Sequence, residues 1–176
     1  MLLNLRSRSN KMLTIKPAGL TQVLLINKLA HRIWPLAYKS IISADQMQYM
    51  LELIYSPSSL KKQMKNLGHK FVIVYNGKSP VGFASYSKKL KSTDTFRLHK
   101  IYILQSEHGK GIGKLVLDNI IAGIQPNGAK FLELNVNRNN NAVEFYKKLG
   151  FTIISEEDID IDNGYFMNDY VMRKTL

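Results

Sequence analysis

The 176-residue sequence contains no cysteine, and that absence removes several kinds of chemistry at once. Disulfide bonds, thiolate metal sites and a catalytic cysteine are all excluded. The four histidines are scattered, and no two of them have the spacing that places metal ligands on one helix face. We therefore expect no bound metal. The histidines are His31, His69, His99 and His108.

The sequence also lacks long apolar runs, and it has far fewer acidic residues than basic ones. No apolar run approaches the roughly 20 residues needed to span a bilayer, and we expect a cytoplasmic protein with no membrane partner. The chain has 25 lysines and arginines against 13 acidic residues, which gives a net charge of +12. That charge favours an anionic ligand or partner, such as nucleic acid, a membrane surface or a small polyphosphate, but a solvated lysine-rich surface explains it equally well.

The arrangement of the basic residues narrows this choice. A protein that binds single-stranded nucleic acid interleaves aromatic residues with basic ones along one strand face. Here the basic residues are spread along the whole chain. We therefore expect no specific nucleic acid partner. A homodimer is left open, because nothing in the sequence decides the oligomeric state.

Local patterns predict one mixed α/β domain over residues 12–176. Residues 1–11 carry three basic residues and no acidic one, and we interpret them as a flexible N-terminal extension. Apolar spacing, glycines, prolines and capping residues mark the elements that follow. The predicted strands are 12–16, 71–75, 81–86, 96–104, 130–136, 151–155 and 165–174, and the predicted helices begin at Thr21, Ser43, Ser58 or Ser59, Ile112 and the asparagines 139–141. The first helix should end or kink at Pro35.

Residues 101–115 carry the clearest functional signal. An apolar run is followed by a polar link, and glycines at alternate positions then open a long apolar-periodic run, which predicts strand, loop and helix. Glycine lets backbone N–H groups approach a ligand. The first turn of a helix also has unpaired N–H groups at the positive end of its dipole. Gly109, Gly111 and Gly113 therefore predict an anion site, most often for phosphate.

Two familiar phosphate loops do not fit this stretch. A P-loop needs Ser or Thr after its lysine, but Leu115 follows Lys114, and the first glycine of the motif would fall on His108. A dinucleotide-binding fingerprint that starts at Gly109 would need its third glycine where Lys114 stands, and it should follow the first strand of its unit. What remains is a pyrophosphate site that needs no metal, on a loop in the second half of a mixed sheet.

At this point the chain resembles the GNAT superfamily of N-acetyltransferases. The pyrophosphate loop of that family has the pattern Gln/Arg-x-x-Gly-x-Gly/Ala, which here falls on residues 108–113, with His108 as a departure in the first position. Residues 139–151 are similar to the family's Asn-x-x-Ala-x-x-Phe-Tyr-x-x-x-Gly-Phe segment. The N-terminal helices and the closing residues 172–176 look most like the bacterial polyamine (spermidine/spermine) N-acetyltransferases.

The resemblance implies a fold and a cosubstrate. The fold would be one GNAT-like α/β domain of the α+β type, with helices on both faces of a mostly antiparallel sheet that is splayed between the strands at 97–104 and 130–136. The pantetheine arm of acetyl-CoA would lie in that gap. The residues implied in binding acetyl-CoA are Tyr102, Ile103, Leu104, His108, Gly109, Lys110, Gly111, Ile112, Gly113, Lys114, Asn135, Asn139 and Tyr146. A helix-capping role explains Asn139 equally well.

The resemblance also implies catalytic roles in a direct transfer within a ternary complex. Tyr146 would protonate the departing thiolate, and packing under the cofactor is the alternative for this tyrosine. The amine must attack uncharged, although an alkylammonium has a pKa near ~10.4, so a proton acceptor or a water chain is expected. His99 stands where many family members have a glutamate, and a neutral imidazole suits that role near pH 7. A structural histidine is equally consistent with the position.

The acceptor would be a primary amine, and a polyamine is the leading candidate. The acidic run at residues 156–162 would attract a polycation, whereas the net charge of +12 would repel one. A protein or peptide amine and an antibiotic-like amine remain alternatives. So does a domain that binds acetyl-CoA without catalysing transfer.

Overall fold

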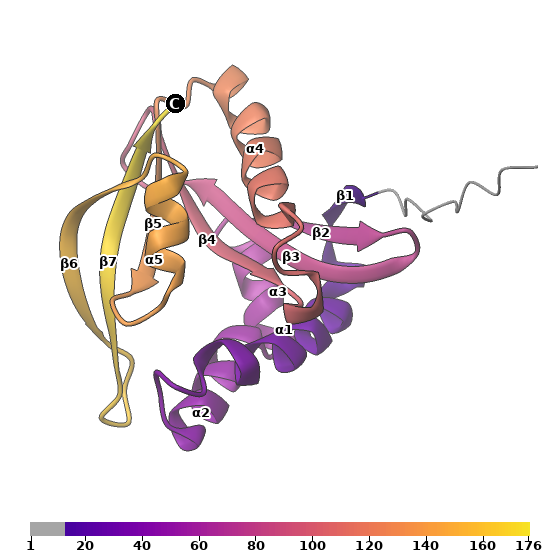
Figure 1. Ribbon diagram of the computed structural model, residues 1–176, viewed down its shortest axis with the longest axis vertical. Helices are drawn as coiled ribbons and strands as arrows, with labels where there is room; N and C mark the ends of the chain where they lie inside the picture. The colour runs from indigo at the N-terminus through magenta and orange to yellow at the C-terminus, as the bar shows by residue number, and fades with distance from the viewer. Residues whose placement is uncertain (1–12) are drawn as a thin grey trace, which may run out of the picture.

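The computed structural model describes residues 13–176 (Figure 1). The extension expected at residues 1–11 lies outside the described residues. Along the described chain, strands and helices follow one another in the predicted order. They are β1 (Leu13–Ala18), α1 (Val23–Tyr38), α2 (Ala44–Tyr55), α3 (Pro57–Lys65), β2 (Lys70–Asn76), β3 (Ser79–Lys88), β4 (Thr95–Ile103), α4 (Ile112–Ile124), β5 (Phe131–Asn137), α5 (Ala142–Lys148), β6 (Thr152–Asp160) and β7 (Phe166–Thr175).

The strands form one seven-stranded sheet in the order β1-β2-β3-β4-β5-β7-β6. Neighbouring strands run antiparallel except β4 and β5, which are parallel. These two strands pair only where residues 95–98 face residues 131–134. Beyond Leu98 they part, while β5 stays paired with β7 along its whole length. The splayed, mostly antiparallel sheet implied by the sequence is therefore confirmed.

Helices cover both faces of the sheet, as Figure 1 shows. On one face α4 and α5 pack over a core that includes Val116, Leu132 and Tyr146. On the other face α1, α2 and α3 pack over a second core that includes Ile26 and Phe83. Because helices lie on both sides, β2 is buried at four successive positions, 71–74, instead of alternating between apolar and polar residues.

Helix α1 continues past the point where the sequence predicts its end. It runs through Pro35 to Tyr38. A proline removes one backbone hydrogen bond from a helix, so the last turn needs other support. The Trp34 ring supplies it, because its centroid lies 4.5 Å from that of Tyr38 and 5.3 Å from that of Tyr55. This packing carries Tyr38 into the middle of the molecule.

Two helices begin elsewhere than the sequence predicts. Thr21 does not cap α1, because residues 20–22 form a 3₁₀ turn in which the Gln22 side chain accepts from the Gly19 N–H at 2.8 Å. Helix α3 is capped by Ser56, whose hydroxyl accepts from the Ser59 N–H. The proline that follows Ser56 occupies the first helical turn, where its missing N–H costs nothing.

The acidic run at residues 156–162 is mostly strand and not a loop. Strand β6 continues to Asp160 and pairs with β7 along the run. Arg138, in the turn after β5, forms ion pairs with Glu156 and Asp158 across the exposed face of the strand. Charged side chains on an edge strand oppose pairing with a second sheet. These carboxylates are therefore already partly neutralised by the chain itself.

Candidate active site

The glycine loop between β4 and α4 has the backbone conformation that an anion cradle needs. Gly109 and Gly111 have φ values of 75° and 74°, in the left-handed region, and open space surrounds the position of a Cβ atom at each. Gly111 directly precedes α4, whose first-turn N–H groups have no partner inside the helix. The conformation and the open space both fit a pyrophosphate held by backbone N–H groups.

Gly113 is required for a different reason. A Cβ atom at this position would lie 3.0 Å from Cζ of Phe145. Phe145 belongs to α5, so the first turn of α4 packs directly against the helix that carries Tyr146. This contact joins the two sequence motifs and fixes the glycine loop relative to Tyr146.

The end of β4 turns part of its backbone toward the gap. The Leu104 N–H donates to the Val81 carbonyl at 2.8 Å and thus faces β3. Because backbone groups alternate sides along an antiparallel strand, the N–H and C=O groups of Ile103 face the gap. The Ile103 carbonyl lies 3.0 Å from Nε2 of His108, which donates to it. The residue that departs from the loop motif therefore folds back onto the strand.

The other predicted loop residues are one core residue and two surface lysines. Ile112 is 2% exposed and anchors the start of α4 in the core. Lys110 pairs with Glu107 at 3.0 Å, and Lys114 pairs with Asp118 at 2.6 Å. Such exposed pairs contribute only about 0–1 kcal/mol. Both lysine amines therefore remain available to an anion at the loop.

Asn135 ties three strands together at the mouth of the gap. Its Oδ1 accepts from the Arg97 guanidinium of β4, and its Nδ2 donates to Glu157 of β6 at 3.0 Å. The side chain predicted to contact the cofactor arm is thus already bonded on both atoms. It holds β4 and β5 at a fixed separation just where their backbone pairing stops.

Asn139 does not supply the cap of α5. Its side chain is exposed, and its N–H donates to Oδ1 of Asn137 at 3.0 Å. The N–H of Ala142 is instead bonded to Oδ1 of Asn140 at 2.9 Å. Asn141 holds the N-cap position without a capping side-chain bond, so Asn140 supplies the side-chain acceptor at the start of α5, and it also lines the cavity described next.

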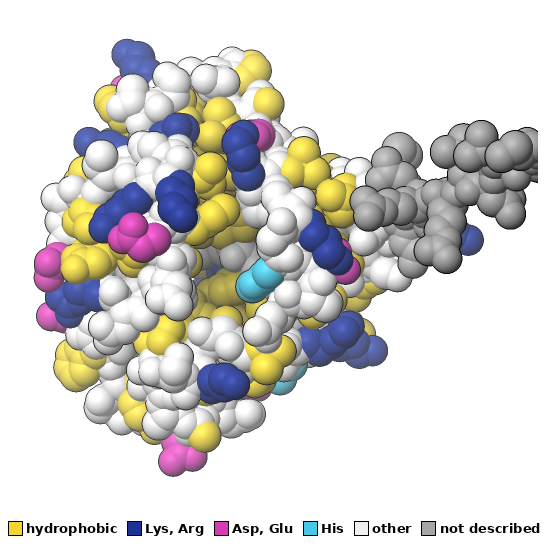
Figure 2. Space-filling view, in the orientation of Figure 1, with side chains coloured by type: hydrophobic (Ala, Val, Ile, Leu, Met, Phe, Trp, Pro, Cys, Tyr) yellow, Lys and Arg dark blue, Asp and Glu magenta, His cyan; other side chains and the backbone are white. Residues whose placement is uncertain are grey.

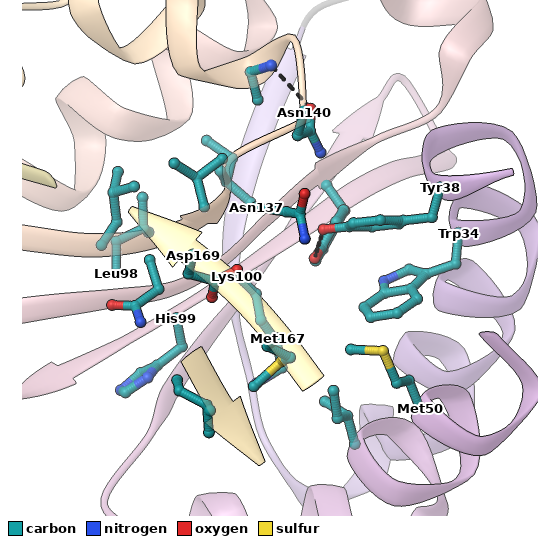
Figure 3. Close-up of a pocket in the computed structure, with 18 of the residues that line it drawn as sticks. Trp34, Tyr38, Met50, Leu98, His99, Lys100, Asn137, Asn140, Met167 and Asp169 are labelled. Carbon is teal, nitrogen blue, oxygen red and sulfur yellow. Dashed lines mark hydrogen bonds between the residues drawn. The ribbon is translucent and has the colours of Figure 1, made fainter. Parts of the chain in front are cut away.

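A cavity of about 330 Å³ opens where β4 and β5 part. Figure 2 shows it as a hollow near the centre of this face, with apolar side chains at its floor. In Figure 3, Trp34, Tyr38 and Met50 approach from the helices α1 and α2, and Asp169 and Lys100 approach from the strands. Its volume is that of a site for a small molecule.

Tyr146 reaches this cavity from α5. It is 7% exposed, and its ring packs edge-on against Phe151 with centroids 5.6 Å apart. Burial, with a smaller contribution from Tyr38, raises the pKa of its hydroxyl. The phenol therefore keeps its proton across the physiological pH range. A buried, protonated phenol at a cavity wall is suited to donate a proton to a nearby thiolate.

Four aromatic side chains build the opposite wall. Tyr102 lies among Trp34, Tyr38 and Tyr55, with ring centroids 5.8–6.4 Å away. The Tyr38 and Tyr102 hydroxyls are 2.9 Å apart, as the dashed line in Figure 3 marks. Trp34 is 2% exposed, and within residues 13–176 its Nε1 has no hydrogen-bond partner. Of these four residues, only Tyr102 was expected at the site from the sequence.

His99 lies at the edge of the cavity, and its ring points away from Trp34 and Tyr38 in Figure 3. The ring stacks on that of His69 with centroids 3.7 Å apart, and Nε2 hydrogen bonds with the Ser87 hydroxyl at 2.8 Å. Burial first, and then the neighbouring positive groups, lower the pKa of His99 to about 3. The imidazole is neutral at pH 7, but it is a weak base there.

Two buried ionisable residues of the cavity wall were not expected from the sequence. Lys100 is 8% exposed and donates to Oε1 of Gln63 at 2.7 Å, and burial lowers its pKa from 10.5 to about 7. Asp169 is also 8% exposed, and burial raises its pKa from 3.8 to about 6. A signal for Asp169 was present, because it takes an apolar position in the alternation of Met167, Asp169 and Val171 along β7.

Two further findings concern the described chain. Within residues 13–176, no group of three or more histidine, aspartate or glutamate side chains is arranged to hold a metal ion. None of the helices in that range is both long and apolar enough to cross a membrane.

Comparison with known proteins places this geometry among acetyltransferases. The family model of the acetyltransferase (GNAT) domain matches residues 39–174. Over 86 residues the chain is 34% identical to an uncharacterized N-acetyltransferase of Methanocaldococcus jannaschii, which covers 46% of this chain and 38% of that protein. Over another 86-residue alignment it is 34% identical to a ribosomal protein bS18-alanine N-acetyltransferase of Haemophilus influenzae, covering 49% of this chain and 53% of that protein.

These curated relatives are therefore matched over less than two thirds of their own length. A solved structure is similar over a longer range. The PaiA N-acetyltransferase from Thermoplasma acidophilum, in complex with coenzyme A, has a TM-score of 0.77 and 22% sequence identity, covering 94% of this chain and 99% of that one. This similarity supports the fold described above.

Proposed function

We propose, because this chain belongs to the GNAT acetyltransferase family, that it moves an acetyl group from acetyl-CoA to the nitrogen of a primary amine. The observation that carries the proposal is the cavity at the parting of β4 and β5, with the glycine loop on one side and the Tyr146 hydroxyl in its wall. Acetyl-CoA, when bound, supplies the activated acetyl thioester.

The chain's own residues would hold this cosubstrate by two kinds of contact. The left-handed glycines 109 and 111 and the first turn of α4 offer N–H groups to the pyrophosphate. The gap-facing N–H of Ile103 offers a hydrogen bond to the pantetheine arm or to the thioester carbonyl, where it would stabilise developing negative charge. Lys110 and Lys114 add positive charge beside the loop.

Tyr146 is proposed as the proton donor to the departing thiolate. Its burial favours the protonated form, and its place on α5 is fixed through the contact of Phe145 with Gly113. Within residues 13–176 the Tyr146 hydroxyl forms no hydrogen bond to another side chain, so its proton is not committed elsewhere. These features support the role of an acid over that of a simple packing residue.

For the proton that the amine releases, we favour an acceptor other than His99. His99 as the base stays a prediction, but its bond to Ser87, its stack on His69 and its lowered pKa all argue against it. A chain of water molecules through the cavity mouth is the route that we favour. It would deliver the proton to solvent, without a single residue holding it.

Three classes of amine are candidates for the acceptor of the acetyl group. A polyamine is the class suggested by the sequence, but the carboxylates of β6 are partly bound by Arg138, which weakens that suggestion. A protein amine is suggested by the ribosomal protein alanine acetyltransferase of Haemophilus influenzae, which aligns with about half of this chain. A small monoamine is the third class. A domain that binds acetyl-CoA without turnover is the alternative function.

One experiment separates these possibilities. The purified protein is incubated with acetyl-CoA and each of several amines, namely polyamines, small monoamines, amino acids, aminoglycosides and peptides, and the release of free thiol is measured. Thiol release that depends on an amine is expected. A thermal shift with acetyl-CoA but no release with any amine would favour the catalytically silent alternative. No thermal shift and no release would refute the proposed function.

A further inference from the structure

Asp169 is a buried carboxylate without a cation beside it. It is 8% exposed on β7, and among residues 13–176 no lysine, arginine or histidine forms an ion pair with it. Glu133, a buried carboxylate with a structural role, provides a contrast. Glu133 is fully buried, yet Lys89 and Arg173 bind it at 2.6 and 2.5 Å. Burying a charge is costly unless the charge is paired.

The two arginines that act electrostatically on Asp169 are already committed to other groups. Arg97 on β4 donates to the Asn135 amide, and Arg138 binds Glu156 and Asp158 on β6. Their charges, and the Asn135 amide, lower the pKa of Asp169, whereas burial and the neighbouring Glu157 raise it more, to about 6. Tyr38 on α1 faces the carboxylate from the helical side and is uncharged at neutral pH. Asp169 is therefore mostly ionised near pH 7, and neither arginine forms an ion pair with it.

The space in front of this carboxylate is walled by aromatic rings. Asp169 lines the cavity of about 330 Å³ together with Trp34, Tyr38 and Tyr102. Figure 3 shows Trp34 and Tyr38 reaching in from the helices on the side opposite Asp169. The faces of such rings attract an organic cation, and their edges and faces also accept an apolar chain. A carboxylate opposite aromatic rings is a suitable site for an ammonium group on an apolar arm.

A second ammonium group would find no partner here. Asp169 is the only carboxylate among the cavity-lining residues of the described chain. The other buried charge of the wall, Lys100, is a cation, and its Nζ lies 5.7 Å from the centroid of the Tyr55 ring. The cavity therefore offers a second positive charge no carboxylate, and Lys100 repels that charge when it is protonated.

We propose that Asp169 binds the ammonium group of the acceptor, and that the cavity selects amines with a single positive charge on an apolar or aromatic arm. This inference rests on the proposed function. It disfavours polyamines as the natural acceptors, although the sequence suggests them.

The first test uses the wild-type protein and the thiol-release assay. 2-Phenylethylamine, a monoamine with an aromatic arm, is compared with spermidine, and its kcat/KM should be at least tenfold higher. N,N,N-trimethyl-2-phenylethylammonium keeps the charge but cannot be acetylated, and it should inhibit competitively against the amine. 2-Phenylethanol has a similar shape without the charge and should inhibit at least tenfold more weakly. Spermidine as the better substrate, or equal inhibition by the two analogues, would overturn the inference.

The second test changes the carboxylate. Asp169→Asn keeps the shape of the side chain and should lower kcat/KM for 2-phenylethylamine at least tenfold, chiefly through the KM for the amine, with the KM for acetyl-CoA unchanged. Asp160→Asn removes an exposed carboxylate from the neighbouring strand and should leave both values near those of the wild type. An unchanged KM for the amine in Asp169→Asn would overturn the inference.

The result also distinguishes this inference from the function on which it rests. If no amine releases thiol, the proposed function fails. If spermidine or a peptide alone releases thiol, the function stands and the assignment to Asp169 fails. If Asp169→Asn does not fold, as judged by its thermal melt, the comparison of the charged and uncharged analogues with the wild-type protein decides the matter alone.

Discussion

Replacing Lys100 with methionine should make the protein more stable and should do so in a pH-dependent way. Lys100 is 8% exposed and has no carboxylate partner among residues 13–176, and burial lowers its pKa from 10.5 to about 7. A lowered pKa for a basic group means that the unfolded chain binds the proton more tightly. The folded state is therefore penalised at any pH below about 10.5, and the penalty is complete below about 7.

The size of this effect follows from the two pKa values. At pH 6 the buried charge costs about 5 kcal/mol. Methionine removes that cost but leaves Oε1 of Gln63 without its donor, at about 1–3 kcal/mol, and removes cation–π contacts with Tyr55 and Phe71 worth about 1 kcal/mol. A net gain of about 1–3 kcal/mol remains, or about 2–4 °C in Tm for each kcal/mol in a domain of this size.

The assay is urea unfolding of wild type and Lys100→Met at pH 6 and pH 9. The advantage of the variant should shrink by about 3 kcal/mol at the higher pH, because most of the wild-type penalty has then disappeared. Lys89→Met is the matched control. It should destabilise the protein, because it removes one of the two cations that hold the buried Glu133. An equal free-energy difference at both pH values, or a loss of stability in Lys100→Met at pH 6, would refute the reasoning.

Three further outcomes are expected. Tyr146→Phe should lower turnover well over tenfold while leaving acetyl-CoA binding, measured by calorimetry, near normal, and unchanged turnover would contradict its role as the acid. Gly111→Leu should abolish the thermal shift caused by acetyl-CoA, whereas Gly128→Leu, which strains another left-handed glycine away from the loop, should preserve it. Wild-type stability should fall as the pH drops below 6.5, because burial lowers the pKa of His69 to about 4 and that of His99 to about 3, so the unfolded chain takes up protons first. The raised pKa of Asp169 stabilises the folded state as the pH falls and so opposes this loss. The double variant His69→Gln/His99→Gln should therefore show a flatter dependence of stability on pH than the wild type, and an equally steep loss would contradict the role of the histidines.

The sequence predicts the elements around the cavity better than the side chains that fill it. The predicted start of α4 at Ile112 agrees with the structure, because a glycine directly before the helix and a sustained apolar period mark it. Residues 108–113 and 139–151 were identified as separate motifs, and the contact of Gly113 with Phe145 joins them in space. Sequence spacing alone could not show that contact, because it depends on how α4 and α5 pack.

The surroundings of His99 depend on a feature that the sequence of β4 does not specify. The resemblance implies His99 as the base, and that role stays a prediction. In the structure the register between β3 and β4 shifts, so that Tyr86 faces Leu98, Ser85 faces Lys100 and no residue of β3 faces His99. At the bulge the His99 ring contacts Ser87 and His69, and the side chain of Lys100 lines the cavity wall. A bulge arises from pairing with a neighbour and is not specified by the strand that carries it.

The short parallel seam between β4 and β5 divides the sheet into two halves. One half, β1 to β4, carries the helices α1 to α3, and the other, β5 to β7, carries α5. Four residue pairs at residues 95–98 and 131–134 form the seam, and the Asn135 bridge to Arg97 and Glu157 stands at its end. A long molecule lying in the open part would replace the missing ladder and stiffen the whole sheet. The cosubstrate would then act as a structural strand for as long as it stays bound.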